Sequence, residues 1–167
     1  MGSDVLIRPA RTSDVQMIRS LVDTFSPDRR LLSKATVALF EDVPEFLVAE
    51  KDGTVIGCGA IHVMWEDLAE VRTLAVAPKA LGTGAGAAIL RELLEKARAF
   101  GVKRVFVLTF EVGFFERFGF AEIEGTPVSH EVFEQLLRSY DEGVAEFLDL
   151  ERVKPNTLGN TRMLLLL

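Results

Sequence analysis

Apolar residues in the first half of the chain are spaced as in short strands that alternate with helices. The spacing predicts strands over 5–8, 46–49, 54–64 and 69–77, and helices over 12–25 and 33–41. Lys51-Asp52-Gly53, between two of these strands, is typical of a hairpin turn. A second turn is expected at 65–68. The first half therefore predicts an antiparallel sheet with accompanying helices.

The second half combines an amphipathic helix with a buried strand. Apolar residues from Ile89 to Phe100 share one helical face, and Gly101 is the predicted helix end. The apolar segment 105–108 is typical of a strand that is covered on both faces. Short helices are predicted over 114–118 and 129–140 and strands over 120–123 and 161–167, whereas 141–160 is ambiguous. This order predicts an α/β fold with one β-α-β unit.

Composition and charge narrow the classes of function. The 167 residues, 49% of them hydrophobic, predict one globular domain over 1–167. A net charge of −6 argues against a nucleic-acid partner. The single cysteine, Cys58, and only two histidines argue against a metal site. No signal peptide or membrane span is visible, so a cytoplasmic protein without a membrane partner is expected.

A glycine-rich loop between a predicted strand and the amphipathic helix is the main chemical signal. Gly82, Gly84 and Gly86 let the backbone approach a ligand closely, and the helix start offers free N–H groups and partial positive charge. We therefore favour a phosphate-bearing ligand over a loop that merely needs positive φ angles. The loop lacks the Gly-Lys-Ser/Thr of a mononucleotide P-loop.

A dinucleotide fingerprint is formally met by Gly82, Gly84 and Ala87. However, several residues separate the preceding strand from Gly82, and the acidic residue at the end of the next strand, Glu111, is 29 positions beyond Gly82. The fingerprint places that acid about 20 positions on. An oxidoreductase is therefore a minor alternative.

Two motifs in order resemble the Gcn5-related N-acetyltransferase (GNAT) family over nearly the whole chain. Leu81-Gly82-Thr83-Gly84-Ala85-Gly86 is similar to its pyrophosphate loop, with Leu81 in place of glutamine or arginine, and Phe115-Glu116-Arg117-Phe118-Gly119-Phe120 is similar to its aromatic segment. The resemblance implies a mixed, mostly antiparallel sheet flanked by helices, with acetyl-CoA as co-substrate and no metal. The implied acetyl-CoA residues are Leu74, Ala75, Val76, Gly82, Thr83, Gly84, Ala85, Gly86, Ala87 and Phe115.

A narrower resemblance is to the short bacterial N-acetylglutamate synthases. It is carried by stretches such as Gly57-Cys58-Gly59-Ala60, 69–76 and Asn160-Thr161-Arg162-Met163-Leu164. It implies an amino-acid N-acetyltransferase that acetylates L-glutamate in a ternary complex, the first step of arginine biosynthesis. An acetyltransferase for another amine, or a domain that binds acyl-CoA without turnover, are the alternatives. The apolar terminal strand is a candidate homodimer interface.

Acetyl transfer to an amine needs alignment, support for the thioester oxygen and a group that accepts a proton. Glu70 matches the family's glutamate and is the first candidate base; its alternative role is an ion pair with a neighbouring cation. His62, expected across a hairpin from Glu70, is the second candidate, as base or relay. Cys58 lies about 13 Å along the strand from His62, too far for a catalytic dyad. Phe115, where many family members have tyrosine, cannot protonate the departing thiolate.

Recognition of the two glutamate carboxylates calls for guanidinium groups. Arg8 is the strongest candidate by resemblance. Arg72 shares a strand face with Glu70, so it either contacts the substrate or neutralises that glutamate. The full set of candidate substrate residues is Arg8, Arg30, Arg72, Thr109, Thr161 and Arg162.

Overall fold

One mixed sheet organises the molecule. Within residues 4–25, 35–157 and 159–167, which a computed structural model describes, seven strands lie in the order β1-β2-β3-β4-β5-β7-β6. They are β1 (Leu6–Pro9), β2 (Phe46–Lys51), β3 (Thr54–Trp65), β4 (Leu68–Val76), β5 (Arg104–Thr109), β6 (Ala121–Glu122) and β7 (Thr161–Leu166). The β4–β5 pair is parallel and the other pairs are antiparallel. The predicted mixed sheet with one β-α-β unit is confirmed.

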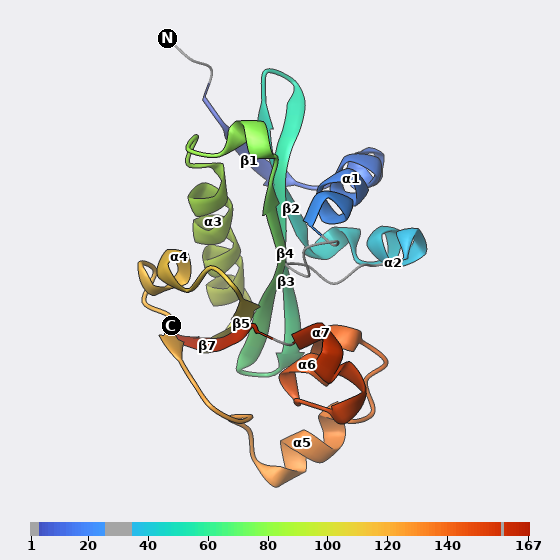
Figure 1. The fold of residues 1–167 in the computed structure, drawn as a ribbon, viewed down its shortest axis with the longest axis vertical. Helices are drawn as coiled ribbons and strands as arrows, with labels where there is room; N and C mark the ends of the chain where they lie inside the picture. Colours follow the sequence, from blue (N-terminus) through green and yellow to red (C-terminus); the bar gives the residue numbers. More distant parts are fainter. Residues whose placement is uncertain (1–3, 26–34, 158) are drawn as a thin grey trace.

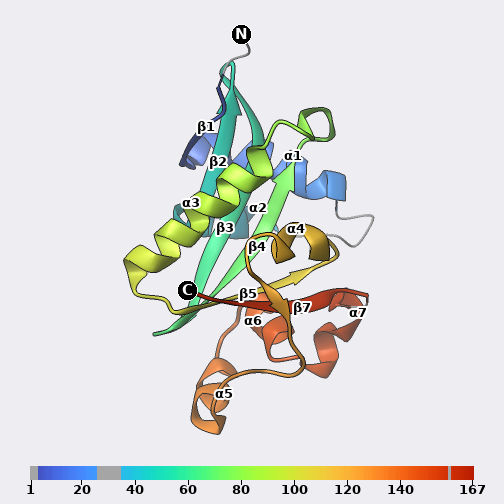
Figure 2. The same cartoon turned by 90° about the vertical axis from the view of Figure 1, so that its left-hand side faces the viewer.

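Helices cover both faces of the sheet (Figures 1 and 2). α3 (Ala85–Phe100) and α4 (Val112–Glu116) lie on one face. On the other face are α1 (Val15–Phe25), α2 (Thr36–Glu41), α5 (His130–Leu136), α6 (Glu142–Phe147) and α7 (Lys154–Thr157). Short 3-10 turns are found at Thr12–Asp14, Val43–Glu45, Pro78–Ala80 and Glu151–Val153. The segment that the sequence left ambiguous thus folds into α6, a 3-10 turn and α7.

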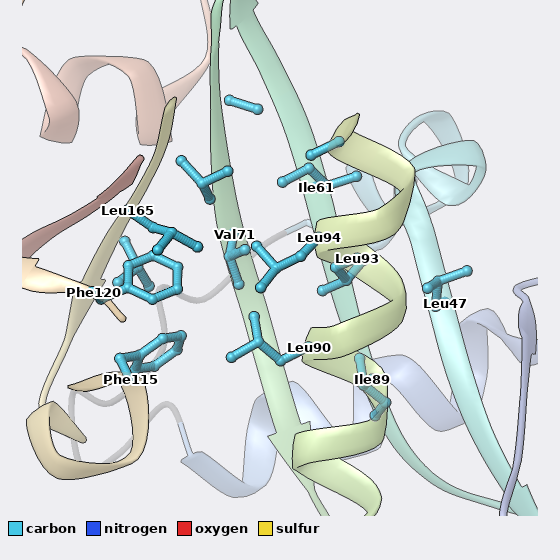
Figure 3. Packing of buried hydrophobic residues seen from close by; sticks show 14 of the residues in the cluster. Leu47, Ile61, Val71, Ile89, Leu90, Leu93, Leu94, Phe115, Phe120 and Leu165 are labelled. Carbon is cyan, nitrogen blue, oxygen red and sulfur yellow. The ribbon is translucent and has the colours of Figure 1, made fainter. Parts of the chain in front are cut away.

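The packing of α3 on the sheet forms the main hydrophobic core (Figure 3). Ile89, Leu90 and Leu93 are fully buried against β3 and β4. Full burial of each such side chain contributes about 1.5–3 kcal/mol. Gly59 of β3 permits this close approach, because a Cβ there would lie only 2.9 Å from Cγ2 of Ile89. The predicted amphipathic helix is confirmed.

Two smaller clusters cover the opposite face. Near α1 and α2 the buried residues include Val15, Ile18, Leu39, Val48 and Ala75. Near α5 and α6 they include Leu68, Phe106, Val144 and Phe147. Leu68 and Ala75 stand at the two ends of β4, so the polar residues between them on this face, Glu70 and Arg72, lie between the two clusters.

Positive φ angles occur at the turns that the sequence predicted. Asp52 and Gly53 have φ of 53° and 77° in the turn between β2 and β3. Gly101, with φ of 91°, ends α3, and Gly119, with φ of 96°, follows α4. The helix predicted over 129–140 is shorter than expected and ends at Leu136.

Candidate active site

A cleft opens where β4 and β5 separate. The two strands pair only over Leu68–Glu70 and Arg104–Phe106. Beyond this pairing, Val71–Val76 and Val107–Glu111 line a cavity of about 710 Å³, together with residues of the glycine-rich loop and α4. Because the strands diverge, main-chain groups of both become available to a ligand between them.

A β-bulge bends β4 beside this cavity. Ala60 pairs with Arg72 and Cys58 with Ala75, so two residues of β4, Thr73 and Leu74, stand opposite Gly59 alone. Thr73 has a φ of 57°, in the left-handed region that a β-branched residue rarely adopts. Bulges re-aim side chains and bend the strand. This one turns the strand along the cavity.

Cys58 lies behind the bulge and is fully buried. Its Sγ is 3.4 Å from the carbonyl oxygen of Thr73, and burial raises the pKa of the thiol to about 12. The thiol is therefore not a nucleophile at neutral pH. Cys58 acts as a small core residue, as its spacing from His62 predicted.

The glycine-rich loop presents main-chain donors at the other end of the cavity. Gly82 and Gly84 have φ of 84° and 83°. Ala88 makes the first hydrogen bond of α3, to the carbonyl oxygen of Gly84, at 3.0 Å. The N–H groups of Gly86 and Ala87 have no acceptor in the part of the chain that the structure describes. Two free donors at the positive end of a 16-residue helix form a site for an anionic group.

The predicted acetyl-CoA residues gather around the cavity with one exception. All of them except Thr83 line it. The Thr83 hydroxyl instead donates to the carbonyl oxygen of Ala80 at 2.7 Å and accepts from the N–H of Ala85 at 3.3 Å. Thr83 therefore shapes the loop, and the N–H of Ala85 is already engaged.

Phe115 is a packing residue at the cavity wall. Its ring meets Phe114 and Phe120 edge-on, with centroids 5.1 and 5.2 Å apart. It is buried and carries no proton to donate. Tyr140, the one tyrosine of the chain, is fully exposed on another segment. The cavity thus offers no tyrosine acid.

A charged cluster occupies the opposite face of β4. Arg72 donates from Nε and Nη2 to Oε1 of Glu70, at 3.0 and 2.6 Å, and from Nη1 to Oδ2 of Asp141, at 2.8 Å. Glu70 is 5% exposed. Of the two roles considered for Arg72, the structure shows the ion pair that neutralises Glu70. Arg72 also lines the cavity.

The carboxyl groups of the cluster differ in pKa. Burial raises the pKa of Glu70, although the charge and hydrogen bonds of Arg72 act against it. Burial also opposes ionisation of Asp141, but there the hydrogen bond and charge of Arg72 prevail and lower the pKa to about 2. Burial, reinforced by the charge of Glu70, raises the pKa of Glu146 to about 7. Three neighbouring carboxyl groups therefore differ widely in proton affinity.

His62 pairs directly across from Glu70 on β3, as the predicted hairpin required. Its Nδ1 lies 2.7 Å from Oε2 of Glu45. The imidazole is therefore oriented by Glu45, while its strand position places it beside Glu70.

Arg8, the strongest candidate substrate residue by resemblance, lies outside this cluster. Its guanidinium bonds Asp14 at 2.8 and 3.0 Å and Glu50 at 3.2 Å. In the strand register Arg8 is level with Ala75 of β4, but β1 lies three strands from β4, so the two residues are about 14 Å apart. These bonds tie β1 to the start of α1 and to β2.

Arg162 lies near the cluster, and each of its three guanidinium nitrogens donates to a main-chain carbonyl oxygen. Nε, Nη1 and Nη2 donate to the carbonyl oxygens of Gly125, Glu146 and Phe147, and the guanidinium stacks 4.9 Å from the Phe106 ring. Burial lowers its pKa. Arg162 therefore holds α6 against β7.

The remaining candidates divide between the cavity and other places. Thr109 lines the cavity, and its hydroxyl accepts from the N–H of Glu111 at 2.8 Å. Thr161 pairs with Thr109 from β7. Arg30 lies outside the described residues.

Sequence reasoning missed Asp141 and Glu146. Asp141 carries a local signal, because an aspartate ahead of Glu142 is a typical helix N-cap, and its Oδ1 does accept from the N–H of Val144 at 3.0 Å. Its contact with Arg72, 69 positions earlier, has no local signal.

In the described ranges, no helix is long and apolar enough to cross a membrane. In the same ranges, His, Cys, Asp and Glu side chains form no group of three or more suited to a metal ion.

Comparison with known proteins agrees with the cleft and the loop. The sequence model of the Acetyltransferase (GNAT) family matches residues 15–120. An amino-acid acetyltransferase of Mycobacterium tuberculosis is 59% identical over 165 residues, which cover 97% of this chain and 94% of that protein.

Two solved structures share the fold. A crystal structure of a Mycobacterium tuberculosis protein in complex with CoA and NLQ has a TM-score of 0.95 at 59% identity, covering 97% of this chain and 99% of that one. An N-acetylglutamate synthase from Neisseria gonorrhoeae, complexed with coenzyme A and N-acetyl-glutamate, has a TM-score of 0.77. It is 24% identical over all of this chain and 36% of that one, so this likeness shows the fold alone.

Proposed function

Because the chain belongs to the Acetyltransferase (GNAT) family, we propose that it transfers the acetyl group of acetyl-CoA to the α-amino group of L-glutamate. The predicted family, enzyme class and acetyl-CoA co-substrate are confirmed. An amino acid as the acceptor is supported by the 59% identity with an amino-acid acetyltransferase over nearly the full length of both chains. Glutamate in particular, and a place at the start of arginine biosynthesis, rest on the sequence stretches that resemble N-acetylglutamate synthases.

The residues around the cavity fit acetyl-CoA. The free N–H groups of Gly86 and Ala87 suit its pyrophosphate, and the backbone of Leu74–Val76 suits its pantetheine arm. When bound, acetyl-CoA supplies the acetyl group as a thioester. Because β4 and β5 separate, the pantetheine arm can extend between the two strands as far as Arg72.

Glu70 is the proposed base for the acceptor ammonium. Burial raises its pKa and so makes the carboxylate a stronger proton acceptor than an exposed glutamate. Arg72 lines the cavity and Glu70 does not, so this role of Glu70 requires a bridging water beside Arg72 to relay the proton. His62, opposite Glu70, is the second candidate for this relay.

The arginine contacts favour a second class of acceptor. Arg8 and Arg162 are engaged by protein groups, and all three guanidinium nitrogens of Arg72 bond Glu70 or Asp141. A second carboxylate on the substrate gains little from guanidinium groups that are already paired. An amino acid with an uncharged side chain, such as glutamine, is therefore the alternative acceptor.

A thiol-release assay with acetyl-CoA and a panel of amino acids tests the proposal, with mass spectrometry of the product. Glutamate-dependent release of CoA together with N-acetylglutamate is the expected result. A higher kcat/KM for glutamine would replace glutamate by the alternative acceptor. Tight binding of acetyl-CoA without release by any amine would contradict an enzymatic function.

A further inference from the structure

Helix α6 joins the charged cluster from a distant part of the sequence. It follows residue 120, where the family match ends. Asp141, its N-cap, is 23% exposed at the side chain and bonds Arg72, which is 9% exposed. Arg72 in turn bonds Glu70 through two nitrogens. A carboxylate, a guanidinium and a second carboxylate thus form one row from the partly buried Asp141 of α6 to the buried Glu70 of β4.

Gly143 shows how closely α6 approaches this row. A Cβ at that position would collide with Nη2 of Arg72, would lie 2.6 Å from its Cζ and 2.9 Å from Oε1 of Glu70. The φ of Gly143 is not in the left-handed region, so its backbone conformation does not require glycine. The space does, because the helix backbone itself forms one wall around the Glu70–Arg72 pair.

The two oxygens of Asp141 perform separate tasks. Oδ1 accepts from the N–H of Val144 and caps α6, whereas Oδ2 accepts from Nη1 of Arg72. The cap alone explains an aspartate at the start of a helix. It does not explain why the second oxygen lies 2.8 Å from the guanidinium that bonds Glu70.

We propose that Asp141 is a positioning residue for acetyl transfer, which holds Arg72 in place and so fixes the carboxylate of Glu70 beside the cavity. This inference rests on the proposed role of Glu70 as the base. Asp141 does not touch the substrate; it acts through Arg72. Because the Arg72 guanidinium bonds both Asp141 and Glu70, the Glu70 carboxylate keeps one orientation toward the bridging water.

Titratable and charged groups from several elements face Glu70. They are Arg72 on the same strand, His62 on β3, Asp141 and Glu146 on α6, and Arg162 on β7. Asp141 raises the pKa of Glu70 by charge repulsion and also shares the positive charge of Arg72. Removal of the Asp141 charge is therefore expected to lower the pKa of Glu70.

The decisive variant is Asp141→Asn. Asparagine caps a helix as well as aspartate does, but its amide nitrogen cannot accept a hydrogen bond from Arg72. We expect kcat to fall at least tenfold, KM for acetyl-CoA to stay within about twofold, and the acid limb of the kcat–pH profile to move to lower pH. Carboxyl carbon NMR, with Glu70 assigned from Glu70→Gln, is expected to show the same downward shift in the Glu70 pKa.

The matched control is Glu142→Gln, which removes the next carboxylate of α6. Glu142 pairs with the exposed Arg152 at 2.7 Å and lies outside the row. We expect it to retain the wild-type kcat and pH profile. A purely structural Asp141 would lower the melting temperature of Asp141→Asn but leave kcat per folded enzyme as in Glu142→Gln, and that result would overturn the inference.

Failure of the base assignment gives a different result. If Glu70→Gln keeps the wild-type acid limb, Glu70 is not the base, and the inference falls with it whatever Asp141→Asn does. If Glu70→Gln loses the limb while Asp141→Asn behaves as wild type, only the positioning role is lost. The acceptor panel reports on glutamate independently of both variants.

Discussion

The two sides of β4 differ in how far apart in the sequence their contacting residues lie. On the cavity side, the glycine-rich loop, the start of α3 and the bulge are local features, each encoded within a few consecutive residues. On the other side, the charged cluster joins Glu70 and Arg72 to Asp141 across 69 positions of sequence. The first side is a surface made mostly of backbone groups, and the second is a cluster of charged side chains.

This difference leads to a division of labour that can be tested. Main-chain donors such as those of Gly86 and Ala87 hold an anionic ligand without changing protonation state. The carboxyl groups of the cluster differ in pKa, and such separation is what acid–base chemistry uses. Changes in the cluster should therefore act on kcat, whereas changes in the loop should act on KM for acetyl-CoA.

The largest effect is expected for Glu70→Gln, which removes the proposed base with little change in shape. General-base groups typically contribute about 10²–10⁴ in rate, so kcat should fall at least 100-fold. The acid limb of the kcat profile should vanish, because wild-type activity rises with pH as Glu70 ionises. Steady-state kinetics from pH 5 to 9 measure both effects, with the exposed Glu66→Gln as control. A retained limb would assign the proton transfer to another group, with His62 next in line.

The sequence could predict the cavity side because its signals are short-range. Gly82 and Gly84 need positive φ, and the spacing of Ile89, Leu90 and Leu93 marks the helix that follows them. The register that sets His62 opposite Glu70 also followed from a hairpin turn. In each case the relevant partners are neighbours in the chain or across a single turn.

On the charged side the sequence offered the Glu70–Arg72 pair only as one of two alternatives, and it gave no signal for the contact with Asp141, 69 positions away. Arg8, Arg72 and Arg162 are alike as isolated residues, and each was a reasonable carboxylate ligand. In the fold Arg8 bonds Asp14 and Glu50, whereas Arg162 donates to backbone carbonyl groups. The segment without clear periodicity, 141–160, supplies Asp141 to Arg72 and Glu146 to Arg162, whereas the partners of Arg8 come from the turn before α1 and from β2.

The second largest effect is expected for Arg8→Ala and concerns the stability of the fold. In Arg8→Ala, Asp14, which is 7% exposed, loses its guanidinium, so we expect the free energy of unfolding to fall by about 2–3 kcal/mol. KM for the amino acid should change less than twofold, because Arg8 lies about 14 Å across the sheet from Ala75. Denaturant unfolding and kinetics measure the two quantities, with Arg98→Ala, which breaks an exposed pair with Glu95, as control. A large rise in KM at unchanged stability would restore Arg8 as a substrate residue.

Glu146 should report on burial within the cluster through pH. Its folded pKa of about 7 lies above the ordinary value of 4.5, so the folded state binds the proton more tightly than the unfolded state. The stabilisation is present below pH 4.5 and is lost as the pH rises through 7. Glu146→Gln removes this dependence.

At pH 8 we expect Glu146→Gln to be more stable than the wild type by about 2 kcal/mol, less than the ~3 kcal/mol equivalent of the full shift. The two should converge near pH 4.5. Thermal unfolding across this range measures the difference, and Glu134→Gln, on the exposed side of α5, should show none of it. Parallel curves for wild type and Glu146→Gln would mean that the carboxyl group is hydrated in the folded protein.

The smallest effect tests the loop in isolation from the cluster. Gly84 and Gly101 stand at the two ends of α3 with φ of 83° and 91°, and a Cβ at either would have no atom within 4 Å. Alanine at either position therefore costs only backbone strain, about 1–2 kcal/mol in unfolding free energy. Gly84→Ala should also raise KM for acetyl-CoA several-fold, because strain at the N-cap displaces the free N–H groups of Gly86 and Ala87, while kcat stays unchanged. Gly101→Ala matches the strain but lies at the far end of the helix, so an equal rise in KM for both variants would mean that helix stability, not donor placement, controls binding.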